Sequence, residues 1–393
     1  MRKTIALMTL SLGATFKPSP LPSVVSVPSG HLYAQKQDVT CCQSSLGLDE
    51  QIWEKSGQSG DRQALLASID NSLRYLETSD AVAAYQRYPV PVITRERVVR
   101  SLERFRQLVL TSYSPQELQA AIRREFVFYQ SVGKDGKGNV FFTAYYEPVY
   151  PASRVQTAEY RYPIYQLPPD FAIWHHPHPT RAQLEGKDGM LGVKSPLRGL
   201  ELVWLRDRLE SFLVHIEGSA RLQLTDGTEM TVGFAGKTEY PYTSVGRELA
   251  KDGKLPLKGL TLPTMIRYFD QHPSELSSYL PRVRGFVFFK QTYGAPAMGS
   301  INVPVTAERS IATDKSLMPP GALALIHTQI PFYNATGRIQ YRNVSRYVLD
   351  QDTGTAIKGP GRVDYFMGSG KPAGDRAGVT GGNGQLYYLL LRE

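Results

Sequence analysis

The sequence predicts a mainly β protein with a helical N-terminal region. Apolar residues recur at spacings of three and four in residues 61–76 and 95–111, which is the period of an amphipathic helix. From Phe126 onward the pattern changes to short β-branched and aromatic runs separated by Gly, Pro, Asn and Asp, as in strands and turns. With 393 residues, of which 41% are hydrophobic, the chain is long enough for two domains or for one domain with a large insertion.

The first residues indicate export. Arg2 and Lys3 precede the apolar run Ile5–Phe16, an order typical of a secretory signal peptide. We expect a leader over residues 1–34, cleaved after Ala34, and then a linker over residues 35–60. The expected location is the periplasm or cell envelope, with association with the outer membrane left open.

The two cysteines, Cys41 and Cys42, are adjacent. Neighbouring cysteines are poor disulfide staples, and zinc ligation needs spaced partners. Val39-Thr40-Cys41 also lacks the Leu-small-small-Cys pattern of bacterial lipoproteins. We therefore expect no lipid anchor on Cys41.

The charge is moderate and mixed in sign. The 45 Lys and Arg residues exceed the 36 Asp and Glu residues by nine, without a long basic run. This balance fits any anionic partner, including a cell-wall polymer or a membrane surface, and we expect no nucleic-acid partner.

Local signals place the elements in order. Ser114 before Pro115 predicts a helix start, because Ser is a good N-cap and Pro suits the first helical turn. Thr225-Asp226-Gly227 predicts a hairpin turn, and Tyr242-Thr243-Ser244 leads into a helix. A further helix is expected over Leu262–Gln271. Strands are expected at Val140–Tyr146, Phe212–Ile216, Ala220–Leu224, Phe286–Lys290, Leu323–Ile326 and Arg346–Leu349.

The last third of the chain carries the densest chemistry. A Gly-rich stretch from Gly354 to Gly384 follows the last of these strands and contains Asp364 and Asp375, with Asp352 just before it. Carboxylates held by Gly-rich backbone can approach a ligand closely, although a solvated surface loop has the same composition.

Three chemistries compete for these aspartates. Asp352-Thr353-Gly354 matches the aspartic-protease triplet, but that chemistry needs two triplets and the chain has one. Gly368-Ser369-Gly370-Lys371 is followed by Pro372, where a phosphate loop needs Ser or Thr. The third is glycoside cleavage, in which a carboxylic acid protonates the leaving oxygen and aromatic groups hold the sugar; the 23 Tyr residues suit it.

Ordered motifs resemble a known family. Residues 142–148, Phe-Thr-Ala-Tyr-Tyr-Glu-Pro, are similar to a signature of the membrane-bound lytic murein transglycosylase A family, and residues 352–364 resemble its three-aspartate domain. The other matching blocks are Tyr162-Pro163-Ile164-Tyr165, Thr180-Arg181-Ala182, His215-Ile216-Glu217-Gly218-Ser219 and Tyr242-Thr243-Ser244-Val245-Gly246-Arg247. Ala144 and Ala220 stand where the family usually has Gly, Glu217 where it has Gln, and Met367 where Trp is frequent.

The resemblance implies a double-psi β-barrel interrupted by an inserted β-rich domain, with the glycan in the groove between them. The helical region and first barrel part would occupy residues 61–150, the insertion 151–284, and the second barrel part, the three-aspartate domain, 285–393.

The same resemblance implies the site residues. Asp364 would be the catalytic acid and base, and Asp352 and Asp314 would be polar supports of the site. Implied substrate contacts are Thr143, Tyr145, Tyr146, Glu147, Gly218, Ser219 and Lys358. For Tyr145 and Tyr146, core packing on alternate strand faces is the alternative to sugar contact. No cofactor and no metal are implied.

The implied reaction is non-hydrolytic cleavage of the β-1,4 bond between N-acetylmuramic acid and N-acetylglucosamine, which leaves a 1,6-anhydro ring. The implied partner is the peptidoglycan glycan strand, with other cell-wall enzymes as further candidates, and the chain is expected to be a monomer. A non-catalytic cell-wall binding module is the alternative, because fold alone does not determine activity.

One dense histidine group stands apart from these motifs. His175, His176 and His178 alternate with prolines and lack a carboxylate neighbour in the sequence. We therefore interpret this segment as a rigid exposed loop and not as a metal site.

Overall fold

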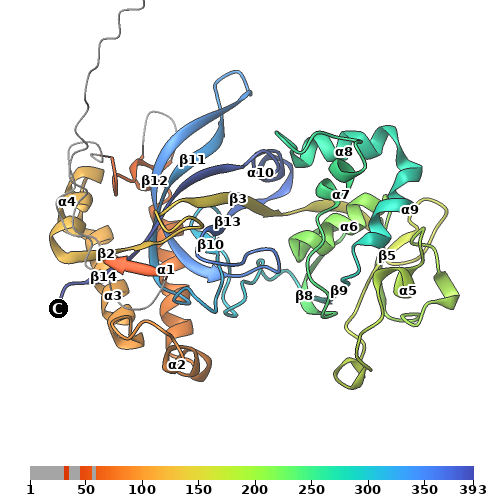
Figure 1. The fold of residues 1–393 in the computed structure, drawn as a ribbon, viewed down its shortest axis with the longest axis horizontal. Coiled ribbons are helices and arrows are strands. Elements are labelled where there is room, and N and C mark those ends of the chain that lie inside the picture. Colours follow the sequence, from red (N-terminus) through yellow and green to blue (C-terminus); the bar gives the residue numbers. More distant parts are fainter. Residues whose placement is uncertain (1–30, 35–44, 55–58) are drawn as a thin grey trace, which may run out of the picture.

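The computed structural model of the chain describes residues 31–34, 45–54 and 59–393. Figure 1 shows a barrel carrying the N-terminal helices and, beside it, a second sheet with its own helices. Cys41, on which we expect no lipid, and the apolar part of the expected leader lie outside the described residues. Within the described part of the chain, none of the helices is both long and apolar enough to cross a membrane.

The helical N-terminal region is confirmed. Its helices begin at good caps: the side chains of Thr78, Thr94 and Ser114 each accept a hydrogen bond from the backbone N–H three residues later. The bounds are α1 Arg62–Leu76, α2 Ser79–Gln86, α3 Arg95–Thr111 and α4 Pro115–Glu125.

Six strands form a closed barrel, because the first and last of them, β14 and β3, also pair with each other. In spatial order they are β14 Gly382–Leu391, β11 Leu323–Tyr333, β12 Ile339–Asp352, β10 Ser310–Ala312, β13 Arg362–Ser369 and β3 Val140–Glu147. The β10–β12 and β13–β3 pairs are parallel. Beyond β14 the sheet continues into β2 Phe126–Ser131 and β1 Leu32–Ala34.

The second sheet lies at the far end of β3 (Figure 1). Its order is β5 Tyr162–Tyr165, β6 Glu201–Leu205, β4 Val149–Ser153, β7 Ser219–Leu224, β8 Glu229–Lys237 and β9 Val287–Gln291. The β7–β8 hairpin predicted from Asp226-Gly227 is confirmed. Because β9 pairs with β8, the chain leaves this sheet after Gln291, later than the expected return near residue 285.

Helices within this second region make the chain more mixed than the predicted mainly β fold. They are α5 Arg181–Glu185, α6 Arg208–Glu217, α7 Val245–Lys251, α8 Leu262–Gln271 and α9 Leu276–Tyr279. The helix predicted after Ser244 and the one predicted at Leu262–Gln271 are confirmed.

The strand predicted at Phe212–Ile216 is wrong, because these residues lie in α6. Asp207 caps this helix by accepting hydrogen bonds from two backbone N–H groups, and Gly218 ends it with φ of 80°. Taken by itself, the apolar run Phe212–Ile216 has the pattern of a buried strand. Together with Leu209, however, Phe212 and Leu213 have the spacing that buries one face of a helix.

The Gly-rich stretch from Gly354 to Gly384 is also more ordered than a loop. It contains β13, the helix α10 Gly370–Ala377 and the start of β14. Asp364 therefore lies on a barrel strand, and Asp352 ends another. Strand pairing, and not loop backbone, fixes the positions of both carboxylates.

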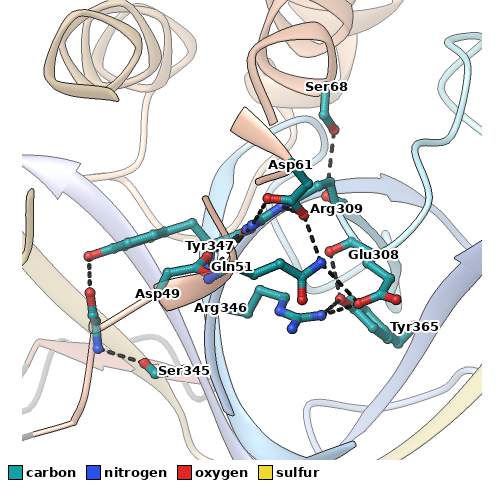
Figure 2. Close-up of polar contacts among 11 residues, drawn as sticks. Asp49, Gln51, Asp61, Ser68, Glu308, Arg309, Ser345, Arg346, Tyr347 and Tyr365 are labelled. Carbon is teal, nitrogen blue, oxygen red and sulfur yellow. Dashed lines mark hydrogen bonds and ion pairs between the residues drawn. The ribbon is translucent and has the colours of Figure 1, made fainter. Parts of the chain in front are cut away.

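A buried ion-pair cluster fastens the N-terminal segment to the barrel (Figure 2). Arg309 is fully buried and contacts Asp49 at 2.6 Å and Asp61 at 2.5 Å. The backbone N–H of Tyr347 on β12 also donates to Asp49 Oδ2 at 3.0 Å. These contacts hold the start of α1 against the barrel strands.

Candidate active site

The strand register brings the two candidate carboxylates to one level of the barrel. Asp364 on β13 pairs with Thr143 on β3 and with Ala312 on β10. Ala312 in turn pairs with Asp352 at the end of β12. Ala312 therefore pairs with Asp364 on one neighbouring strand and with Asp352 on the other.

Asp364 has the environment of a carboxyl that can hold a proton. Burial raises its pKa above the usual range, and the negative charge of Asp352 acts in the same direction. The positive charge of Arg362 and a hydrogen bond from Thr143 Oγ1 to Oδ1, at 2.5 Å, oppose the rise without cancelling it. A general acid needs this kind of raised pKa.

Asp352 is held by three donors. Tyr145 donates its hydroxyl to Oδ2 at 2.8 Å, and the backbone N–H groups of Ser300 and Thr353 donate to Oδ1 at 2.9 and 2.8 Å. Burial still raises the pKa of Asp352, although these bonds and the charge of Lys315 lower it. Both of its oxygens are thus engaged by the protein, whereas the structure gives Asp364 a donor at Oδ1.

Asp314, the third predicted aspartate, has a different setting. It is buried and accepts hydrogen bonds from the backbone N–H of Gly359 at 2.8 Å and from Ser316 Oγ at 2.7 Å. Burial alone would raise the pKa of Asp314, but these bonds and the Lys358 charge, 3.8 Å away, leave it lowered. Asp314 and Lys358 therefore hold the loop between β12 and β13.

A groove of about 290 Å³ opens at Asp364, between the barrel and the second sheet. Lys237 at the end of β8 crosses between the two sides, because its Nζ donates to Thr355 Oγ1 at 2.6 Å. The barrel wall contains Thr143, Gly354, Thr355, Ala356, Ile357, Arg362 and Asp364, and the opposite wall includes Arg181, His215, Tyr240 and Tyr242. This arrangement matches the expected groove between two regions.

Glu217, at the end of α6, was not assigned a role from the sequence. Its Oε2 accepts a hydrogen bond from the backbone N–H of Tyr146 at 3.1 Å. Burial raises the pKa of Glu217 to about 8, and the Asp364 charge adds to the rise. The only signal in the sequence was its departure from the family's usual Gln; Lys237 had no motif at all.

Three of the predicted substrate contacts on β3 are Thr143, Tyr145 and Tyr146. Thr143 and Tyr145 lie at the carboxylates, and the Tyr145 ring packs 5.1 Å from Phe366. Tyr146 is buried, with its hydroxyl 3.5 Å from that of Tyr150 and its ring against α10. For Tyr145 the structure thus favours the site, and for Tyr146 it favours core packing.

Three other predicted contacts lie at the junction of the two sheets. Glu147 is 2% exposed and binds Arg221 at 2.8 Å and Ser369 Oγ at 2.5 Å. Gly218 is the left-handed residue that ends α6, and Ser219 begins β7. These residues position the end of β3 and the start of β7 relative to each other.

Comparisons with known proteins agree with this geometry. Residues 141–290 match the MltA specific insert domain and residues 309–390 match the 3D domain. The membrane-bound lytic murein transglycosylase A of Escherichia coli K12 is 30% identical over 263 residues, which are 66% of this chain and 68% of that protein. The chain belongs to the membrane-bound lytic murein transglycosylase A family.

Solved structures of family members have the same fold. A membrane-bound lytic murein transglycosylase from Agrobacterium tumefaciens is 28% identical with a TM-score of 0.62, covering 76% of this chain and 85% of that one. E. coli MltA with bound chitohexaose has a TM-score of 0.66 at 24% identity, covering 86% of this chain and 92% of that one. At that identity the second likeness concerns the fold alone.

Proposed function

We propose that Asp364 performs both proton transfers of a peptidoglycan lytic transglycosylase. Family membership identifies the chain as such an enzyme, which acts on the β-1,4 bond between N-acetylmuramic acid and N-acetylglucosamine. The single observation that supports the residue assignment is a carboxyl with a raised pKa that lines the groove. The chitohexaose bound to the E. coli relative supports a glycan strand as the ligand of this groove.

In the proposed reaction, Asp364 first donates its proton to the glycosidic oxygen as the bond to C1 of the muramic acid breaks. The C6 hydroxyl of the same sugar then attacks C1, and the Asp364 carboxylate takes its proton. One aspartate is sufficient because the nucleophile is already tethered to the reacting ring. No water is consumed, and the carboxyl returns to its starting state.

Thr143 and Asp352 prepare Asp364 for this cycle. The Thr143 hydroxyl occupies Oδ1 and leaves Oδ2 for the proton that is transferred. Asp352, oriented by Tyr145, contributes a negative charge that favours the protonated form of Asp364. We also propose that Tyr145 and Lys358 contact the glycan, whereas Tyr146, Glu147, Gly218 and Ser219 act by positioning the groove walls.

The finer description of the fold is also a proposal. The two parallel pairs within the six-stranded barrel support double-psi connectivity. We propose that the inserted domain extends from about residue 149 to 291, the span of the second sheet.

We propose export to the cell envelope, with a leader that ends earlier than Ala34. The basic and apolar N-terminal residues support export, as does the membrane-bound designation of the relatives. Leu32 is 1% exposed and pairs with Ser131 of β2, so cleavage after Ala34 would remove β1. The intact mass of the exported protein gives the first residue, and a mature chain that starts at Gln35 would contradict this proposal.

The decisive experiment replaces Asp364 by Asn and compares it with Asp375→Asn on α10, an exposed aspartate paired with Lys371. Asn keeps the size of the side chain but removes proton transfer, so turnover of purified peptidoglycan should fall by roughly 10² to 10⁴. Sedimentation with insoluble peptidoglycan should show that binding survives. The Asp375 variant should keep its activity.

Mass analysis of the products separates the alternatives. Anhydro products are lighter than hydrolysis products by one water, and the unaltered protein should release them. Full activity in Asp364→Asn would place the acid elsewhere. Binding without any product from the unaltered protein would instead indicate a glycan-binding module.

A further inference from the structure

Three side chains converge beside the groove, two from the histidine loop (residues 175–179) and one from the segment that follows β8. His176 and His178 lie on the loop before α5, and Glu239 lies just after β8. Their ligand atoms are all within 4.8 Å of one another. His176 Nδ1 lies 3.5 Å from Glu239 Oε1, and His178 Nδ1 lies next to Oε2. Folding thus supplies the carboxylate that the sequence lacked near these histidines.

The arrangement of these groups suits a shared cation. His178 is 7% exposed, and its buried Nδ1 faces the carboxylate of Glu239. A neutral imidazole can donate an N–H to this carboxylate, and a divalent ion can take the place of such protons and bind both imidazoles and the carboxylate together.

The ligands are held in place by their surroundings. The rings of Phe171 and Trp174 pack against His178, at centroid distances of 4.9 and 6.1 Å. The backbone N–H of His178 donates to Glu239 Oε1 at 2.7 Å, and the Tyr240 hydroxyl donates to the His178 carbonyl. Such outer contacts fix ligand orientation, and His176, whose side chain is 72% exposed, leaves a path for the ion from solvent.

We propose that His176, His178 and Glu239 bind a zinc-like divalent ion at the edge of the groove. Two imidazole nitrogens and one carboxylate oxygen suit Zn²⁺, while Mg²⁺ and Ca²⁺ prefer oxygen ligands. The ion joins the histidine loop to the end of β8. Both segments continue directly into the groove wall, at Arg181 and at Tyr240, so the ion stabilises that wall.

Calorimetric titration of ZnCl₂ into the chelator-treated full chain tests the site. Cys41 and Cys42 are alkylated first, so that thiols do not bind zinc. We expect one saturable Zn²⁺ per chain, with no comparable binding of Mg²⁺. His176→Ala and Glu239→Gln should weaken binding at least tenfold, whereas His175→Ala, a matched change outside the triad, should not.

His176→Ala is the decisive variant because its exposed side chain can be removed without opening the core. Circular dichroism checks that each variant is folded, and a Co²⁺ absorption spectrum that depends on His176 gives an independent readout. Absence of saturable Zn²⁺ binding would overturn the proposal. So would equal affinity in the His176 and His175 variants, which would place the zinc at another site.

Discussion

Asp352 and Asp314 belong to the same set of predicted aspartates, but their surroundings shift their pKa values in opposite directions. The pKa of Asp352 is raised because burial outweighs the donors around it. The pKa of Asp314 is lowered because the Gly359 and Ser316 bonds outweigh burial. Asp352 can therefore set the electrostatic environment of Asp364, whereas Asp314 serves the loop that it binds.

Asp352→Asn should change the pH dependence of turnover. The Asp352 charge raises the pKa of Asp364, and the proposed reaction needs protonated Asp364. Removing this charge lowers that pKa, so the decline in activity at high pH should begin at lower pH. The fall in kcat should stay below the roughly 10²-fold expected for loss of the acid itself.

Rates on peptidoglycan over a pH series check this, with Asp314→Asn as the control. Asp314 holds the loop at Gly359, so its variant should lose stability without moving the high-pH decline. An unshifted profile in Asp352→Asn would remove Asp352 from its proposed role.

Glu217→Gln should remove a pH dependence of stability. The folded-state pKa of about 8 lies above the unfolded value of 4.5, so Glu217 favours the folded state most below pH 4.5, and this benefit is lost as pH rises toward 8. Gln mimics the neutral form at every pH. The variant should therefore gain stability relative to the unaltered protein from about pH 4.5 to 8, by at most about 1.4 kcal/mol per pH unit.

Denaturant unfolding at several pH values measures the difference in unfolding free energy between the variant and the unaltered protein. A difference that does not change with pH would contradict the raised pKa of Glu217. Turnover at pH 7 provides a separate check. The chemical step should stay largely intact, because Glu217 is neutral there as Gln is. A loss comparable to that of Asp364→Asn would give Glu217 a role in the reaction.

At the scale of elements, the attachment of the N-terminal segment to the barrel depends on one buried cation, Arg309. Arg309 connects Asp49 and Asp61 to the strand residue Tyr347 through hydrogen bonds of 2.5 to 2.7 Å (Figure 2). Nearby, Arg346 and Arg376 both pair with Glu308, whose pKa these two charges lower to about 2 although burial opposes them. The helices therefore dock through charges that pair only in the folded state.

Arg309→Leu should destabilise the protein by about 3 to 5 kcal/mol, because it leaves two carboxylates near the core without their partner. Asp70→Asn is the comparison, since both side chains of the Asp70–Arg106 pair are partly exposed, and it should cost at most about 1 kcal/mol. Urea unfolding of both variants gives the two values. If both variants lost a similar, small amount of unfolding free energy, packing and not the Arg309 ion pairs would dock the helices.

At the scale of the whole molecule, the groove exists because two separately packed regions face each other. The barrel has its own apolar cluster, and the second sheet has another around Ile164, Leu222 and Phe289. Lys237 and Thr355 connect the two sides with a hydrogen bond at the groove. This contact fixes the distance between the walls and does not touch Asp364.

Lys237→Met should therefore weaken glycan binding more than chemistry. Loss of a bond worth about 1 kcal/mol corresponds to a roughly fivefold rise in KM, with kcat nearly unchanged. Lys251→Met is the control, because Lys251 pairs with Glu248 within α7. Steady-state kinetics on soluble glycan strands separate the two constants. A fall in kcat with unchanged KM would contradict this assignment.

The sequence by itself determined much of the local structure. Ser114 and Ser244 begin helices, and Asp226-Gly227 makes a turn, because caps and turns are chosen by a few neighbouring residues. The family resemblance singled out Asp364 as the proposed acid, because the residues that mark its motif lie close together in the chain, whereas the rise in its pKa comes from burial in the fold. The family resemblance, and not the pattern of residues, implied a groove between two regions, and the structure contains a groove there.

Only the tertiary structure decided what surrounds these residues. Helix α6 formed where a strand was predicted because its apolar face packs against other buried residues of the second region. The contacts of Asp364 with Thr143 and of Lys237 with Thr355 join residues 221 and 118 positions apart. Glu239 met His178 across 61 positions. Local patterns do not encode such pairs, because the packing of whole elements selects them and thereby sets burial, charge and pKa.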